Sequence, residues 1–147
     1  MTTATTLSFA NLVKSYFSKA NTRVAITNLI VKDLALSIDF YQKLFSLNCD
    51  IITPDYALFN YNDSRFCLIK ESAANDLLNY NIVAPTSNTS TLTNSVTIFC
   101  DNCYELWSHA ISCGATTMRK PFKTKDGNVI AIFSSPDNYI FIIKGTI

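Results

Sequence analysis

The sequence predicts an α+β fold built from two βαβββ units, and three observations support this class. Short β-branched and aromatic runs alternate with segments of helical period, which is typical of mixed structure. The order strand, helix, three strands occurs once before residue 72 and again after residue 93. A Ser-, Thr- and Asn-rich stretch, residues 72–93, separates the two and begins as a possible short helix. The 147 residues suffice for one sizeable core and are short for two unrelated domains.

Residues 1–22 predict a helical extension that precedes the units. One apolar stripe with helical spacing is formed by Phe9, Leu12, Val13, Tyr16 and Phe17. The alternative is a mitochondrial targeting segment, because the first 32 residues contain four basic residues and no acidic one. We expect the helix, and mitochondrial targeting stays open.

The first unit is predicted over residues 23–71. A β-branched run at 23–31 predicts a strand, and the helical period from residue 34 to 47 predicts a helix with Asp33 positioned to cap its first turn. Three short strands should follow, separated by turn-forming residues, at 49–52, 56–61 and 65–70.

The second unit is predicted over residues 94–147 and repeats this order. A strand at 95–100 leads into a helix at 101–113, which Gly114 should end. Strands are then expected at 115–118, 129–134 and 139–144. A shift of 68 positions places 31–34 on 99–102, and a shift of 74 places 68–70 on 142–144. The shared order of elements, rather than residue identity, indicates an internal repeat.

Composition excludes several functions. The formal net charge of +1 argues against a dedicated nucleic-acid or anionic-membrane protein. No apolar run reaches the roughly 18 residues that cross a bilayer, and the N-terminus lacks a secretory signal pattern. We therefore expect a soluble, cytoplasmic protein. The chain has five cysteines, an odd number, and is large enough to fold without disulfide bonds, which favours reduced thiols.

Two groups of short motifs, one in each half, resemble the vicinal oxygen chelate superfamily, which includes glyoxalase I, extradiol dioxygenases, fosfomycin resistance enzymes and bleomycin resistance proteins. The first half contains VKDL at 31–34 and SIDFY at 37–41. The second half contains GAT at 114–116, DG at 126–127 and FSSPDN at 133–138. The sequence departs from the superfamily pattern at Ser46, Ser135 and Asn138, where Gly, Asp and Gly are usual.

The resemblance implies a half-open barrel, formed by the sheets of the two βαβββ units, with helices outside and a ligand cavity between the sheets. It also implies that barrels are completed within or between chains, so we expect a homodimer. Metal-using relatives take ligands from the first and last strands of each unit, and superfamily spacing places these positions at Ile26, Leu68, Asn94 and Ile142. Three of these residues are aliphatic, and Asn94 offers only a weak carbonyl oxygen, so we expect no metal and no cofactor.

The alignment also predicts a ligand-binding cavity face. Lys70 and Lys144 lie two residues beyond aligned metal positions, so strand alternation should bring them to the same face. They would attract an anionic group on a ligand, or simply reach solvent at the strand ends. The predicted ligand-binding residues are Ile26, Asn28, Phe66, Leu68, Lys70, Asn94, Ile98, Ile142 and Lys144. The competing interpretation is that the apolar members fill a collapsed core.

Two further features have structural explanations. Cys100 and Cys103 have the C-x-x-C spacing of zinc and redox sites, but no second pair completes such a site, so structural thiols are expected. His109 lies in the predicted second helix, which the resemblance places on the outer side of the sheet, so a surface histidine is expected rather than a general base.

The sequence therefore predicts a glyoxalase- and bleomycin-resistance-like protein that binds a small organic molecule, not nucleic acid or membrane. Catalysis is left open, with no catalytic residue assigned and metal-dependent lyase or dioxygenase activity disfavoured. One alternative is a superfamily enzyme, such as a lyase, epimerase or dioxygenase, that uses displaced metal ligands such as Asp63, Glu71 or His109. The other is a non-catalytic interaction protein with a vestigial cavity.

Overall fold

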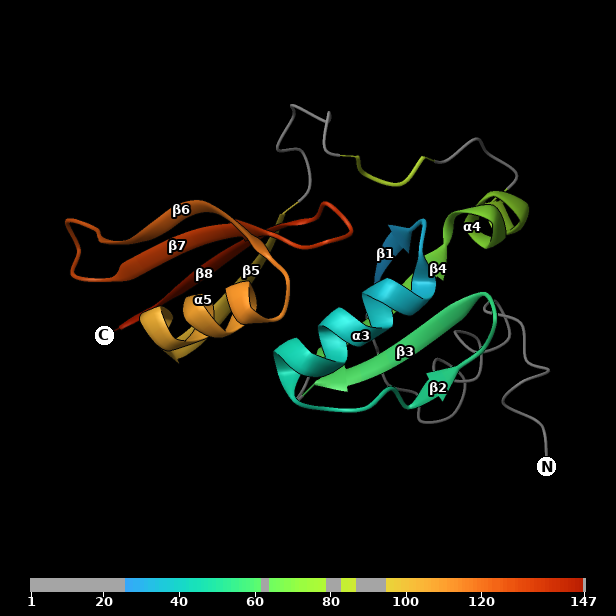
Figure 1. The fold of residues 1–147 in the computed structure, drawn as a ribbon, viewed down its shortest axis with the longest axis horizontal. Coiled ribbons are helices and arrows are strands. Elements are labelled where there is room, and N and C mark those ends of the chain that lie inside the picture. Colours follow the sequence, from blue (N-terminus) through green and yellow to red (C-terminus); the bar gives the residue numbers. More distant parts are fainter. Residues whose placement is uncertain (1–25, 62–63, 79–82, 87–94, 147) are drawn as a thin grey trace, which may run out of the picture. The chain divides into compact units, whose positions relative to one another are not determined.

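The computed structural model describes residues 26–61, 64–78, 83–86 and 95–146 (Figure 1). The predicted N-terminal helix lies outside the described residues. They form two compact units, which we call the first unit (up to Ile38, with Phe45–Ala84) and the second unit (Asp39–Leu44, with Pro85–Ile147). No helix among the described residues is long and apolar enough to span a membrane.

The first unit contains a four-stranded sheet of order β1-β4-β3-β2. Strand β1 is parallel to β4, whereas β4, β3 and β2 are antiparallel neighbours. A parallel pair needs a long connection, and here the connection includes α3 and two strands. The elements are β1 (Thr27–Val31), α3 (Leu34–Phe45, of which Asp39–Leu44 belongs to the second unit), β2 (Ile51–Ile52), β3 (Tyr56–Tyr61) and β4 (Ser64–Lys70), followed by α4 (Glu71–Leu78).

The second unit repeats this topology, with a sheet of order β5-β8-β7-β6 in which β5 and β8 are parallel. Its elements are β5 (Ser95–Asn102), α5 (Cys103–Ser112), β6 (Thr116–Lys123), β7 (Val129–Ser134) and β8 (Ile140–Thr146). The two predicted βαβββ units are thus confirmed. Strand β6 runs five residues beyond its predicted end at 118, because register shifts between Thr117 and Phe122 carry this edge strand past Pro121.

Side-chain caps and a glycine set the helix ends. Asp33 caps α3 as predicted, since its Oδ1 accepts a hydrogen bond from the Leu36 N–H at 3.0 Å. Asn102 caps α5 in the same way, accepting from Glu105 at 3.1 Å. Helix α5 therefore begins two residues later than predicted. Gly114 follows it with φ of 113°, a conformation that side chains disfavour.

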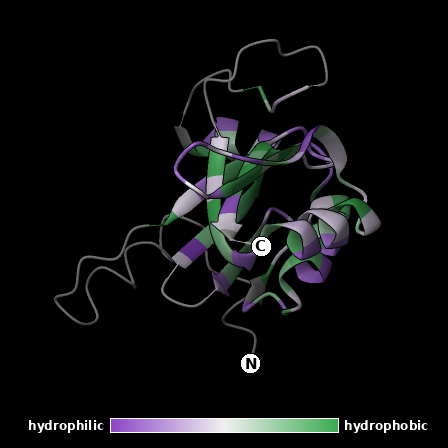
Figure 2. Cartoon of the chain, turned by 90° about the vertical axis from the view of Figure 1, so that its left-hand side faces the viewer, coloured by the Kyte–Doolittle hydropathy of each residue, from purple (hydrophilic) through white to green (hydrophobic). Residues whose placement is uncertain are grey.

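In each unit the core lies between the sheet and a helix. Strands alternate between the two faces, and the buried residues of β7 and β8 are Val129, Ala131, Phe133, Phe141 and Ile143. The rings of Phe133 and Phe141 stack with centroids 5.2 Å apart. Hydrophobic residues are concentrated on the strands in Figure 2.

The second unit also joins two of the segments that carry the superfamily resemblance. The Tyr41 hydroxyl, from the 37–41 segment, donates a hydrogen bond to Asp137 Oδ1 at 3.0 Å in the 133–138 segment. Ser135 donates to the same oxygen. Burial raises the pKa of Tyr41 well above its ordinary value, so the hydroxyl remains a donor at neutral pH. These signature residues therefore have a structural role.

Candidate functional site

In the first unit, the strand register separates predicted site residues that the alignment had placed on one face. Leu68 pairs with Leu29, whereas Asn28 pairs with Cys67. Paired residues share a face, so Phe66, Leu68 and Lys70 lie on one side of the sheet and Ile26 and Asn28 on the other.

Helix α3 covers the side that carries Phe66, because the ring centroids of Phe45 and Phe66 are 5.6 Å apart. Leu68 is fully buried there. The premise of one shared face was therefore wrong for the first unit.

The second unit shows the same division. Ile98 pairs with Ile143 and faces the α5 side, whereas Ile142 and Lys144 lie on the opposite face. Asn94 lies outside the described residues. Of the nine predicted residues, Ile142 and Lys144 remain together on a face that no helix of their unit covers, and their contact with a ligand stays a prediction.

In the first unit, the face opposite α3 is largely filled. Ile26 and Ile30 of β1 pack against a core cluster that includes Ala74 of α4, and the other buried members are Tyr56, Leu58, Cys67 and Ile69. Burial raises the pKa of the Cys67 thiol to about 12. This face matches the collapsed-core interpretation of its apolar residues.

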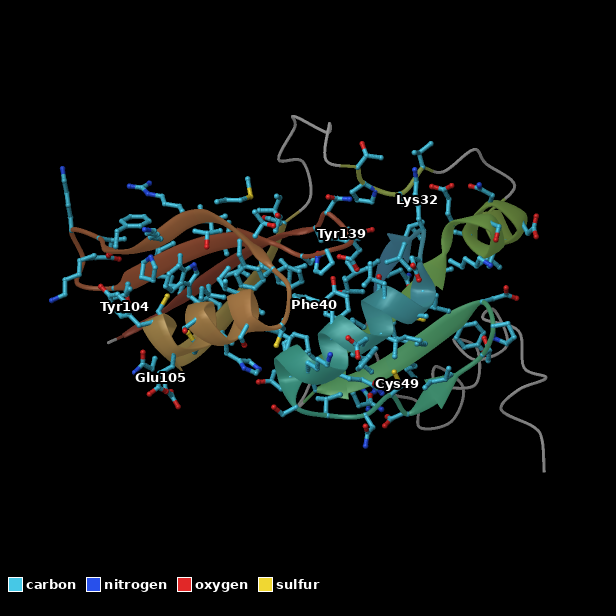
Figure 3. All side chains as sticks on the ribbon, in the orientation of Figure 1. Lys32, Phe40, Cys49, Tyr104, Glu105 and Tyr139 are labelled. Atoms are coloured by element: carbon cyan, nitrogen blue, oxygen red, sulfur yellow. The ribbon has the colours of Figure 1, made fainter. Side chains whose placement is uncertain are left out.

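In the described part of the second unit, no helix lies on the corresponding face, which we call the open face. Helix α5 occupies the other side of the sheet, where Trp107 Nε1 donates a hydrogen bond to Thr117 at 3.2 Å. Tyr104 and Glu105 point from α5 away from the strands (Figure 3). On the open face, Phe99 is 77 % exposed, which is unusual for a strand phenylalanine.

Cross-strand pairing arranges the open face as rows of side chains in the order β5, β8, β7, β6. The first row is Phe99, Lys144, Ile130 and Phe122, and the second is Thr97, Ile142, Ile132 and Arg119. The third row is Ser95, Ile140, Ser134 and Thr116. The face therefore has an aliphatic centre, two aromatic side chains at one end and hydroxyl groups at the other.

Both charged residues in these rows are basic. The Arg119 guanidinium carbon lies 3.6 Å from the centroid of the Phe122 ring, a cation–π contact. Lys144 makes no ion pair or hydrogen bond through its side chain with another described residue. Asp126 is in the turn after β6, and hydrogen bonds from Thr124 and Asn128, with a smaller contribution from the Lys144 charge, lower its pKa.

A separate pocket of about 550 Å³ lies in the first unit, at the start of α3. Its polar lining includes Lys32, Asp33 and Lys70, and its apolar lining is Leu34, Ala35, Ile38, Ile52 and Pro54. The Thr53 hydroxyl in its wall is already used, as an acceptor from the Tyr56 N–H at 3.1 Å. Predicted residue Lys70 thus lines a pocket on the α3 side of the sheet rather than the opposite face.

The strands that would supply metal ligands do not suit a divalent metal. Strands β1, β4, β5 and β8 contain no His or Glu, and their one Asp is the exposed Asp101. This composition does not depend on how the strands are aligned. Among the described residues, no group of three His, Cys, Asp or Glu is positioned to hold a metal. The described residues of these strands therefore offer few of the donors that a divalent metal prefers.

Two of the three displaced ligands considered as an alternative, Glu71 and His109, make other polar contacts. Glu71 Oε2 accepts a hydrogen bond from the Ala84 N–H at 2.7 Å, and Asp63 lies outside the described residues. His109 is exposed on α5, where its Nε2 lies 2.8 Å from the Lys43 carbonyl oxygen and 3.6 Å from Cys113 Sγ.

The cysteines are free thiols. Burial raises the pKa of Cys103 to about 11 and also raises that of Cys100, so neither is a thiolate at neutral pH. Cys103, the first residue of α5, is fully buried, and its Sγ donates weakly to the Ile143 carbonyl. These features match the predicted structural role.

Comparison with known protein families decides the identity of the fold. The model of the Glyoxalase/Bleomycin resistance protein/Dioxygenase superfamily matches residues 23–143. The chain belongs to this superfamily. No curated protein matches the sequence.

Solved structures of the superfamily have the same fold at low sequence identity. A glyoxalase/bleomycin resistance protein/dioxygenase family enzyme from Burkholderia phytofirmans is 21% identical, with a TM-score of 0.72 over 86% of this chain and 100% of that one. A glyoxalase-related enzyme from Fulvimarina pelagi is 16% identical, with a TM-score of 0.72 over 85% and 88% of the two chains. The fosfomycin resistance protein FosX from Mesorhizobium loti is 13% identical, with a TM-score of 0.61 over 85% and 92%.

Several residues of the open face were missed at the sequence level. Phe99, Thr97, Arg119 and Phe122 were not selected, because superfamily spacing placed a metal position at Asn94 and alternation then put Val96 and Ile98 on the cavity face. Both faces of this strand are partly apolar, so alternation alone does not identify the covered one. The signal that was available is the Arg119–Phe122 pair within a cluster of basic residues on an edge strand.

Proposed function

We propose that the protein is a metal-independent member of the superfamily that binds a small organic molecule on the open face of its second unit. The observation that carries the proposal is the row arrangement: an aliphatic centre of four isoleucines is flanked by Phe99 and Phe122 and bordered by hydroxyl groups. Apolar surface with a few convergent polar groups is the usual composition of a ligand site.

The strand residues argue against the metal-dependent alternative. Lyase and dioxygenase mechanisms in the superfamily polarise substrate oxygens on a metal, and β1, β4, β5 and β8 do not provide the necessary ligand set. No step through a metal is therefore proposed.

The proposal extends to assembly and compartment. We expect a homodimer, as the superfamily resemblance implies. The five free thiols suit the reducing cytoplasm.

The first test is native mass spectrometry of protein purified without chelators or added metal, with elemental analysis of the same sample. The expected spectrum contains an organic adduct and no stoichiometric metal, and it also gives the oligomeric state. Stoichiometric Zn, Ni, Fe or Mn would overturn the metal-independent assignment.

A point variant tests the location of the site. Phe99→Ser should weaken binding of the neutral fluorescent probe N-phenyl-1-naphthylamine by about tenfold, because an exposed aromatic contact worth roughly 1–2 kcal/mol is lost. Since Phe99 is 77 % exposed, the free energy of unfolding should change by less than about 0.5 kcal/mol.

The control for this variant is Leu36→Ser, which removes a side chain 48 % exposed on α3. It should leave probe affinity unchanged. If both variants lose affinity equally, or if neither loses affinity, the open face is not the binding site.

A further inference from the structure

We propose that the ligand of the open face is an organic anion with a flat apolar body, and that Lys144 and Arg119 bind its anionic group. This inference rests on the proposed function and specifies the chemical class of the ligand. It follows from the positions of the charges on the open face, which superfamily membership does not determine.

The first step is the sign of the charge. The twelve residues of the three rows include two cations and no carboxylate. The charged side chains of this face would therefore attract a carboxylate, sulfonate or phosphate group and repel a cationic ligand. The acidic residue Asp126 interacts electrostatically with Lys144, and its carboxylate already accepts hydrogen bonds from Thr124 and Asn128.

The second step is the position of the two cations. Lys144 on β8 pairs with Ile130, and Arg119 on β6 pairs with Ile132, so the two residues flank the same strand, β7. With strands about 4.8 Å apart and a two-residue offset of about 7 Å along the strand, their backbones are separated by roughly 12 Å. Two long side chains on this spacing can converge on one anionic group above Ile130 and Ile132, where the guanidinium would supply paired N–H donors.

The third step is the shape of the remaining surface. Phe99 is the direct neighbour of Lys144, and Phe122 lies under the Arg119 guanidinium. An aromatic ring beside each cation favours a ligand whose flat apolar body stacks while its anionic group is bound. The hydroxyl-bearing row of Ser95, Ser134 and Thr116 lies at the other end, along the same strands.

A matched pair of probes tests the charge. The anion 8-anilinonaphthalene-1-sulfonate differs from neutral N-phenyl-1-naphthylamine by a single sulfonate. The anion should bind the wild-type protein at least about fivefold more tightly than the neutral probe, as measured by fluorescence titration. Raising the ionic strength from 0.01 to 0.5 M should reduce this preference.

A matched pair of variants locates the charge. Lys144→Met removes the ammonium group but keeps an unbranched apolar chain, and it should lower affinity for the anionic probe by about five- to tenfold, with the neutral probe unaffected. Lys123→Met removes the same charge from β6, but Lys123 pairs with Val129 and so lies on the opposite face. It should change neither affinity by more than about twofold. Equal melting temperatures of the three proteins will show that folding is unchanged.

The outcomes separate the two proposals. In one outcome, Phe99→Ser lowers affinity for the neutral probe, but the anionic probe binds no more tightly than the neutral one and Lys144→Met lowers neither affinity. The anionic class of the ligand is then wrong, while the site on the open face stands. If neither probe binds, or Phe99→Ser leaves both affinities unchanged, both proposals are overturned.

Discussion

Ser46 and Asn138 have φ angles of 53° and 67°, at positions where the superfamily pattern has glycine. The left-handed α region costs a residue with a Cβ roughly 1–2 kcal/mol, and asparagine is one of the side chains that visits it routinely. Asn138 is further held by a backbone hydrogen bond to Ser135 at 2.9 Å. The departures from the pattern thus keep the backbone conformation that the glycines serve, and the turn geometry survives the loss of the motif residue.

Buried thiols make stability sensitive to alkaline pH. The pKa of Cys67 is raised from 9.0 to about 12, so between these values the native state retains a proton that the unfolded chain loses. Stability is complete below pH 9 and falls as pH rises, by up to about 1.4 kcal/mol per pH unit for this thiol. Cys67→Ala should lower the free energy of unfolding by about 1 kcal/mol at pH 7, as measured by urea denaturation. Above pH 9, the stability of the variant should fall less steeply than that of the wild-type protein.

The control for the alkaline experiment is the wild-type protein over the same pH range, because tyrosines also titrate there. Burial raises the pKa of Tyr41 and Tyr56, and the wild-type protein and Cys67→Ala both retain this contribution. The difference between the two pH profiles therefore isolates Cys67. Parallel profiles would show that the thiol does not contribute.

Element boundaries could be predicted well where turn residues bracket a strand. Strands β3 and β7 begin and end at the predicted residues, between short polar turns. The covered face was harder to predict, because Phe66, Cys67, Leu68 and Ile69 form one continuous apolar run. A strand buried on both faces has no polar side that identifies which face is which. The alignment therefore placed Leu68 on the cavity face, whereas Cys67 and Ile69 are the residues that face away from α3.

At the element scale, the pairing of β5 with β8 depends on Gly145. A Cβ at this position would lie 2.1 Å from the Cys100 carbonyl oxygen, next to the register shift in β5. Gly145→Ala must therefore move backbone rather than a flexible side chain. We expect a loss of at least about 3 kcal/mol in the free energy of unfolding, measured by urea denaturation.

Gly127→Ala is the control for Gly145→Ala. Gly127 has φ of 85°, and a Cβ there would meet no atom within 4 Å. Its cost should be limited to the backbone conformation, about 1–2 kcal/mol. If both alanines cost the same, close approach of β5 and β8 is not what requires Gly145.

At the scale of the whole molecule, two units of one topology present different surfaces. In the first unit, the face opposite α3 holds the cluster around Leu58 and Cys67, joined by Ala74 of α4. In the second unit, the equivalent face exposes Phe99. The repeat could be predicted from the order of elements, but this asymmetry could not, because it depends on where a short helix after β4 packs.

This asymmetry predicts the stoichiometry of binding. Only the second unit offers an uncovered apolar sheet face among the described residues, so a chain should bind one molecule of N-phenyl-1-naphthylamine on a sheet face. The measurement is a fluorescence titration at protein concentrations well above Kd, where the break point gives the ratio. A ratio of two that Phe99→Ser reduces to one would reveal a second site in the first unit.

The strand order also constrains the sequence of events during synthesis. In each sheet the last strand made lies between the first strand and the rest, as β8 does between β5 and β7. Among the described strands, β5 pairs with β8 alone, so it must wait about 45 residues of elongation for that partner. At ribosomal speeds of about 5–20 residues per second, that wait lasts several seconds. Throughout it, Val96, Ile98 and Phe99 lack their sheet neighbours, so this strand stays accessible to a chaperone until β8 is made.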